Sequence, residues 1–255
     1  MRAKNIFFLM KSGCISLENF SPISLAEMSA VKLMNRIDTK FVTNRQTLVK
    51  LLAMAEELYK VQEIDGQRIA SYHTLYYDTP ENTMYIAHQN GKKNRQKLRI
   101  RTYLDSNEHY LEVKTKNNHG RTKKKRVKME ENSLEPYDAF LTERLWLSPK
   151  DMMPKIENNF HRITLVNEDM TERLTIDHDL SFHHFETDNR LSLDNAVIIE
   201  LKRDGLKPSP IMPILNKLRI FPMGVSKYFR GMALSNPSLK QNRFKERIHY
   251  ITTRL

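Results

Sequence analysis

Charged residues occupy every second position of several otherwise apolar segments. In 97–103, Arg99 and Arg101 alternate with Leu98 and Ile100. Because successive side chains of a β-strand point to opposite faces, this spacing predicts a strand with one charged and one apolar face. The same alternation recurs along the chain, in 36–41, 111–116, 124–129, 172–177 and 198–202.

The remaining pattern predicts further strands, separated by turn signals and by amphipathic helices. Strands are expected over 35–43, 68–79, 95–104, 109–117, 122–129, 155–167, 172–185 and 194–203. Helices are expected over 44–60, 81–90, 133–145, 148–153, 210–220 and 226–234. The helix over 44–60 has an apolar stripe that must cover an apolar surface. We therefore expect an α+β fold, a closed antiparallel β-barrel with helices packed on its outside.

The charge balance of the chain favours a polyanionic partner. The 255 residues carry a formal net charge of +12, which suits nucleic acid, phosphorylated small molecules, inorganic phosphates or anionic lipid. The basic run 123–128 lies on a predicted strand, so its side chains divide between two faces and nucleic acid is a less favoured partner. The histidines His178, His183 and His184 match no common metal-ligand spacing.

The alternating charges have two interpretations. Antiparallel sheets often expose one polar face to water, which would make the charges an ordinary solvated surface. If helices cover the apolar faces instead, the cations line the interior of the barrel. Buried charges need partners, and the carboxylates on these faces are too few to neutralise the cations. The missing partner would then be a small, dense polyanion such as triphosphate, together with a divalent metal.

The order of the motifs resembles a known family. The motifs are "RIDTKF" (36–41), "LYYDTP" (75–80), "KLRIRTY" (97–103), "LEVKTK" (111–116), "KKKRV" (123–127), "HRIT" (161–164), "ERLTID" (172–177), "IELK" (199–202) and "SKYFRG" (226–231). This order is similar to that of the VTC domain, the catalytic domain of the vacuolar transporter chaperone polyphosphate polymerases. That domain belongs to the triphosphate tunnel metalloenzyme (CYTH-like) superfamily, whose barrel forms a tunnel for triphosphate and a divalent metal.

The resemblance implies a set of site residues. The expected catalytic cations, which would bind phosphate, are Lys40, Arg99, Arg101, Lys114, Arg162 and Arg173. Further substrate-binding residues are expected at Lys124, Lys202, Ser226 and Lys227. Glu200, with Glu112, is expected to hold Mn²⁺ or Mg²⁺. One position departs from the polymerases, which carry a basic residue two positions before the Ser-Lys pair, where this chain has Gly224.

Three functions remain open at this point. The leading one is a metal-dependent phosphotransferase that moves the ATP γ-phosphate onto a growing inorganic polyphosphate chain. The second is a tripolyphosphate or nucleoside triphosphate hydrolase, in which Glu112 or Asp38 would orient water. The third is a non-enzymatic binder of polyphosphate or nucleic acid, which would be insensitive to chelators and sensitive to salt.

The chain shows no linker and is expected to form one tunnel domain over 30–240. A lead-in over 1–29 and a C-terminal extension over 241–255 would flank it. The single cysteine, Cys14, excludes an intramolecular disulfide framework. No run approaches the about 18 apolar residues of a membrane span, so we expect a cytoplasmic protein without a span.

Overall fold

The computed structural model describes residues 14–29, 31, 36–205 and 207–254. Its strands are β1 (Ser21–Ile23), β2 (Arg36–Asn44), β3 (Tyr59–Gln62), β4 (Ala70–Asp78), β5 (Arg95–Tyr103), β6 (Glu108–Lys116), β7 (Thr122–Met129), β8 (Met153–Asn167), β9 (Glu172–His184), β10 (Arg190–Leu193) and β11 (Ala196–Asp204). Its α-helices are α2 (Leu25–Met28), α3 (Arg45–Ala55), α4 (Thr83–Gln89), α5 (Asp138–Arg144), α6 (Ile211–Lys217), α7 (Lys227–Ser235) and α8 (Lys245–Arg254). Three 3₁₀ turns are η1 (Glu135–Tyr137), η2 (Pro149–Asp151) and η3 (Asn242–Phe244).

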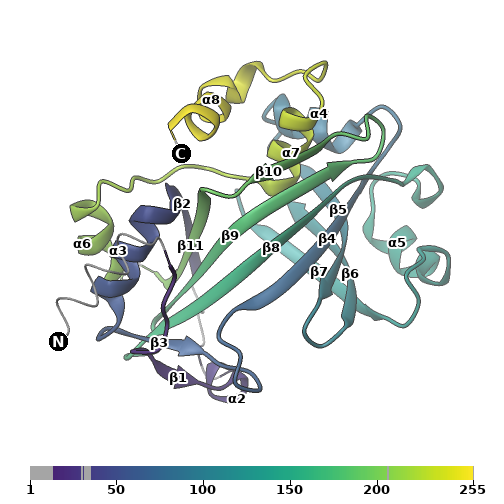
Figure 1. Ribbon diagram of the computed structural model, residues 1–255. Helices are drawn as coiled ribbons and strands as arrows, with labels where there is room; N and C mark the ends of the chain where they lie inside the picture. Colours follow the sequence, from purple (N-terminus) through teal and green to yellow (C-terminus); the bar gives the residue numbers. More distant parts are fainter. Residues whose placement is uncertain (1–13, 30, 32–35, 206, 255) are drawn as a thin grey trace.

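The strands form one curled sheet with the order β2-β11-β9-β8-β4-β5-β6-β7, in which all neighbours are antiparallel. Short strands extend it, because β3 pairs with β8, β1 pairs in parallel with β3, and β10 pairs with β9. The long β8 and β9 cross the middle of the molecule (Figure 1). The predicted α+β class and antiparallel sheet are therefore confirmed.

The prediction of a closed barrel is wrong, because the sheet curls into an open half-barrel. The strand order begins at β2 and ends at β7, and no described residues of these two strands pair with each other. Both edge strands carry cations on the charged face, including Lys40 on β2 and Lys124 on β7. Strand β7 is exposed at most of its positions, so it brings little apolar surface that closure of the sheet would bury.

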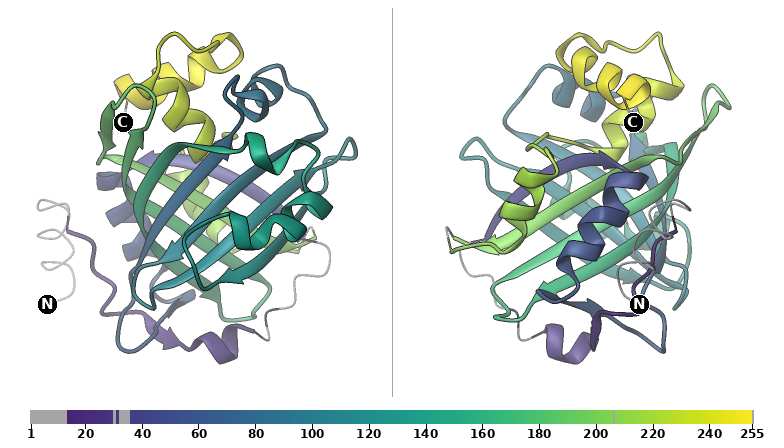
Figure 2. Two further views of the ribbon diagram at one scale, coloured as in Figure 1. Left: turned by 90° about the vertical axis from the view of Figure 1, so that its right-hand side faces the viewer. Right: turned by 60° about the vertical axis from the view of Figure 1, so that its left-hand side comes forward.

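The apolar face of the sheet is convex and is covered by helices, as the amphipathic pattern predicts. One half carries α3 and α6, whose residues Leu51 and Leu215 belong to the same buried cluster as Ile176 and Ile199. The other half carries α5, whose Leu141 packs in a cluster with the strand residues of β5 and β6. Figure 2 shows α5 on one side of the molecule and α3 and α6 on another, all of them outside the curled sheet.

The charged face is concave, so its two ends face each other across the interior. Lys40 on β2 donates a hydrogen bond to the backbone carbonyl of Val225, over 3.3 Å. Lys97 on β5 donates to the hydroxyl of Ser226, over 2.8 Å. These two strands lie far apart in the sheet order, yet their lysines reach neighbouring residues of one segment. The segment that precedes α7 therefore spans the concave side.

Helix α7 closes one end of the concave face. Its residues Tyr228, Phe229 and Met232 share a buried cluster with aromatic and aliphatic side chains of β4, β8 and β9. Ser226 begins the helix as its N-cap and accepts a hydrogen bond from the backbone N–H of Phe229. The concave face is thus apolar beneath α7 and charged over the remainder.

Several elements differ from the sequence-based prediction. The helix expected over 44–60 ends at Ala55, and the chain then forms β3, in which Tyr59 and Val61 are buried and pair with β8. The expected extension over 241–255 contains α8. The lead-in over 1–29 includes β1 and α2, whereas residues 1–13 lie outside the described part. None of the described helices combines the length and apolarity needed to cross a lipid bilayer.

Gly231→Ala should destabilise the fold, because α7 packs against the sheet at this glycine. A Cβ atom there would lie 2.6 Å from Ile156 Cδ1 and 2.6 Å from Phe182 Cδ1. Alanine in place of glycine within a helix is normally stabilising by about 0.5–1 kcal/mol, but this overpacking should instead cost about 1–3 kcal/mol. Urea unfolding measures the change.

The matched control is Gly224→Ala, where the nearest atom to a Cβ is the flexible end of Arg247, at 3.1 Å. This variant should change the free energy of unfolding by less than about 0.5 kcal/mol. Equal stability of the two variants would contradict the packing of α7 described above.

Candidate functional site

The first of three ion clusters on the concave face surrounds Glu200 of β11. Lys202 donates a hydrogen bond to its Oε2 over 2.6 Å, and Lys40 Nζ lies 3.6 Å from its Oε1. Burial raises the pKa of Glu200, but Lys202 and Lys40 outweigh burial and hold that pKa well below its usual range. The carboxylate is therefore ionised, and its side chain remains 23% exposed.

The second cluster surrounds Asp177 of β9. Arg162 donates two hydrogen bonds to its carboxylate, from Nε over 2.5 Å and from Nη2 over 2.8 Å. Lys227 of α7 donates to the same group. Burial lowers the pKa of Lys227 to about 7 even with this partner. Asp177 was absent from the predicted site, although its alternation with the charged positions of 172–177 placed it on this face.

The third cluster surrounds Glu112 of β6, whose side chain is fully buried. Arg99 donates to Oε2 from Nε over 2.7 Å, and Lys124 donates to Oε1 over 2.9 Å. Burial raises the pKa of Glu112, but Arg99 and Arg101 hold that pKa well below its usual range. Both carboxylate oxygens of Glu112 thus accept hydrogen bonds from cations.

Several other cations of the concave face have no such partner, and four of them matter most here. These are Lys97, Arg101, Lys114 and Arg173. Among the described residues, no carboxylate lies within ion-pair distance of any of these four side chains. Arg101 is 8% exposed, and its Nε has no hydrogen-bond partner. Its guanidinium carbon lies 5.4 Å from the ring centre of Tyr72 and 5.8 Å from that of Phe160. These aromatic faces orient Arg101 without neutralising it.

Crowding of like charges is visible in the pKa values of these cations. Burial and then Lys40 lower the pKa of Lys97 to about 7. Arg99 and burial lower the pKa of Lys114 well below its usual value. Burial and then Arg99 lower the pKa of Arg101 to about 10. The protein therefore holds a positive potential that its own carboxylates do not balance. Lys97 was not among the predicted site residues, although it shares a strand face with Arg99.

The two predicted metal carboxylates lie on different strands and have different surroundings. Glu200 lies on β11 and Glu112 on β6, and the strands β9, β8, β4 and β5 separate them in the sheet. Glu112 is enclosed by Arg99 and Lys124, whereas Glu200 is partly open to the concave side. Glu200 is therefore the carboxylate of this face that is better placed to meet a metal ion.

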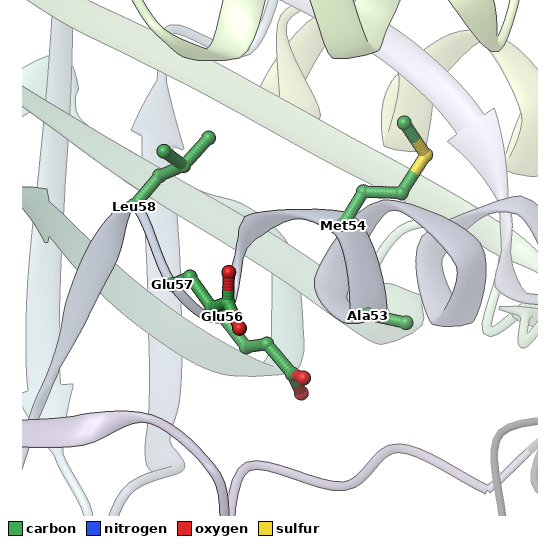
Figure 3. A pocket seen from close by; sticks show the side chains of 5 residues that line it. All are labelled: Ala53, Met54, Glu56, Glu57 and Leu58. Atoms are coloured by element: carbon green, nitrogen blue, oxygen red, sulfur yellow. The ribbon is translucent and has the colours of Figure 1, made fainter. Parts of the chain in front are cut away.

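A surface hollow on another part of the molecule has the wrong charge for phosphate. It lies at the C-terminal end of α3 and is lined by Ala53, Met54, Glu56, Glu57 and Leu58. Figure 3 shows the glutamate side chains beside this hollow. The described residues that line the hollow include two carboxylates and no cation, which disfavours an anionic ligand, so the concave face remains the candidate site.

Several solved structures resemble this chain. A proposed adenylate cyclase from Bacillus halodurans is 14% identical with a TM-score of 0.51, over 76% of this chain and 96% of its own. A Pyrococcus horikoshii protein is 14% identical with a TM-score of 0.44, over 78% and 98% of the two chains. A Hippeastrum protein described as having a dominant triphosphatase activity is 15% identical with a TM-score of 0.47, over 76% and 95%. At 14% identity and a TM-score of 0.51, the likeness to the Bacillus halodurans protein shows a shared fold.

The family follows from the sequence. Residues 35–236 match the family model of the VTC domain, so the chain belongs to the VTC domain family. The resemblance seen in the order of the motifs is thereby confirmed. A comparison with curated proteins gives no match.

Arg99→Ala and Arg101→Ala should differ in their effect on stability. The two arginines share a strand face, but Arg99 pairs with a carboxylate and Arg101 does not. Arg101→Ala removes a buried cation without a carboxylate, so the free energy of unfolding should fall by less than about 1.5 kcal/mol. Arg99→Ala leaves the buried Glu112 with Lys124 as its one hydrogen-bonding cation, which should cost about 3–5 kcal/mol. Urea unfolding of both variants measures the difference.

Tripolyphosphate affinity completes this comparison. Arg101→Ala should bind tripolyphosphate at least about 10-fold more weakly than the parent, since a lost bidentate phosphate contact costs about 2 kcal/mol or more. Unchanged affinity in Arg101→Ala, or equal losses of stability in the two variants, would show that the pairing on this face is misassigned.

Proposed function

We propose that this chain is a metal-dependent phosphotransferase that extends inorganic polyphosphate with the γ-phosphate of ATP. The observation that carries the proposal is the group of crowded concave-face cations without carboxylate partners, which includes the buried Arg101. Arginine forks match pairs of phosphate oxygens, and lysines supply point charges beside them. A triphosphate group offers several such oxygens within one small ligand.

The shape of the face supports a chain-like phosphate over a folded nucleic acid. The cations lie on the inner side of a curled sheet, and α7 covers one end of that side. A duplex would need these charges on an open outer surface, whereas a polyphosphate strand is narrow enough to enter. The predicted cations Lys40, Arg162 and Arg173 come from β2, β8 and β9, so a ligand in the interior would meet several strands together.

The residues present fit a divalent metal that is shared with the substrate. Mg²⁺ and Mn²⁺ prefer oxygen ligands, and such ions are commonly held by one or two carboxylates together with phosphate oxygens. Glu200 is ionised and partly open, so it would hold the ion with phosphate oxygens of the substrate. When bound, the metal would neutralise charge on the transferring group. The protein's own cations would position the phosphates in line.

Transfer to phosphate is favoured over hydrolysis, because the carboxylates that could orient water are already paired with cations. A hydrolase needs a group that orients water, and the candidates were Glu112 and Asp38. Glu112 is buried between Arg99 and Lys124, and Asp38 pairs with Arg36 Nε over 2.7 Å. A terminal phosphate of a growing chain is already ionised and needs no strong general base.

A basic side chain from another part of the chain lies beside Gly224. The resemblance to the polymerases leads us to expect a basic side chain at this position. Arg247 of α8 donates a hydrogen bond from Nη1 to the carbonyl of Gly224, over 3.5 Å. A guanidinium therefore lies beside position 224, where the polymerases carry a basic residue. Its presence there supports polymerase chemistry in this chain.

Incubation with ATP and Mn²⁺ should yield long polyphosphate, resolved as a ladder on a gel, together with ADP. Glu200→Gln should lose at least about 100-fold of this activity and should keep tripolyphosphate affinity, since Lys40 and Lys202 lose their carboxylate and remain cationic. Glu168→Gln, on an exposed residue paired with Lys60, is the matched control and should behave as the parent.

Release of free phosphate without any polymer would replace the proposal with the hydrolase. Binding of polyphosphate without turnover, unchanged in the presence of a chelator, would replace it with the non-enzymatic binder. Full metal-dependent activity in Glu200→Gln would move the metal to another carboxylate.

A further inference from the structure

A second group of possible metal ligands lies on β8 and β9, away from the concave face. His161 of β8 and His178 of β9 are directly paired across the sheet, and Asp179 follows His178. One ligand atom from each of the three residues lies within 4.8 Å of the other two. Asp179 Oδ2 lies 2.9 Å from His178 Nδ1 and 3.4 Å from His161 Nδ1.

The local backbone brings these side chains to one side of the sheet. Consecutive residues of a strand normally point to opposite faces, so His178 and Asp179 would be separated in a regular strand. Asp179 instead has a φ of 51°, and the pairing of β8 with β9 shifts register between Asn159 and His161. Irregularities of this kind re-aim side chains, and aspartate tolerates the left-handed conformation.

We propose that His161, His178 and Asp179 form a site for a transition-metal divalent cation of the Zn²⁺ class. Zinc binds imidazole nitrogen and carboxylate oxygen at about 2.0–2.2 Å in tetrahedral sites, which places ligand atoms about 3.3 Å apart. The two separations from Asp179 Oδ2 bracket this value. His178 is buried and His161 is 49% exposed, so the site is closed on one side and leaves a position open for water.

Arg45 supports the carboxylate from the outside of the cluster. Arg45 Nη1 lies 2.5 Å from Asp179 Oδ1, which leaves Oδ2 directed at the two imidazoles. Hydrogen bonds to the distal oxygen of a ligating carboxylate are the usual means of fixing its orientation. The positive charge of Arg45 also opposes the metal, so the site should favour cations that bind imidazole strongly over Mg²⁺.

The proposed site is independent of the phosphate site. Along each strand the ligands alternate with concave-face residues, because His161 precedes Arg162 and His178 follows Asp177. The imidazoles therefore lie on the convex side of the same two strands. A bound cation would link β8 to β9 directly behind the ion pair of Arg162 and Asp177. The expected consequence is stabilisation of the middle of the sheet.

Titration of chelator-treated full-length protein with Co²⁺ and then Zn²⁺ tests the proposal, in excess Mg²⁺ to occupy oxygen-ligand sites. We expect one Co²⁺ per chain with a visible absorption band, displaced by one Zn²⁺, and a rise in the melting temperature. His161→Ala and Asp179→Asn should each weaken binding about 10–100-fold. Asparagine also tolerates a positive φ, so Asp179→Asn should keep the backbone.

Three controls separate this cluster from other binding groups. His183→Ala changes a histidine of the same strand outside the cluster, Cys14→Ser removes the exposed thiol, and Glu200→Gln removes the concave-face carboxylate. All three should bind Zn²⁺ as the parent does. Absence of stoichiometric binding in the parent, or unchanged affinity in both His161→Ala and Asp179→Asn, would overturn the proposal.

Discussion

The crowding of cations on one face of a curled sheet is the constraint on which the rest of the structure depends. A buried cation is costly unless an opposite charge or a hydrogen-bonding partner accompanies it. The chain meets this cost only in part, because Glu200, Asp177 and Glu112 each serve two cations, while others, such as Arg101 and Lys114, have no carboxylate. The cations without a carboxylate partner leave a net positive charge on this face, which favours binding of a polyanion.

The architecture follows from keeping that face charged. The apolar sides of the strands turn outward, so α3, α6 and α5 must cover the convex surface. One end of the interior is filled by the aromatic side chains beneath α7, which begins at Ser226 and delivers Lys227 to Asp177. The sheet stays open between β2 and β7, and the edge strand β7 is largely exposed.

The sequence predicted the local strands and helices better than it predicted the closure of the sheet or the pairing of side chains. Alternation in 97–103 was sufficient to place Arg99 and Arg101 on one face, but only the register with β6 shows that Glu112 neutralises one of them and not the other. Strand β3 begins within the last residues of the helix expected over 44–60, because its pairing with β8 outweighs local propensity. Local periodicity does not show which residues of two strands lie opposite each other. The sequence alone therefore did not reveal that His161 pairs with His178.

Calorimetric titration with tripolyphosphate tests the central claim most directly, when it is repeated in buffers of different ionisation enthalpy. Lys97 and Lys227 have a pKa of about 7 in the ligand-free protein, against an ordinary value of 10.5. A polyanion favours their charged forms and raises these pKa values, so between pH 7 and pH 10.5 binding should take up protons. The account predicts net proton uptake in this window, which fades below pH 7 where both lysines are already charged. Tripolyphosphate binding without proton uptake at any pH in the window would contradict it.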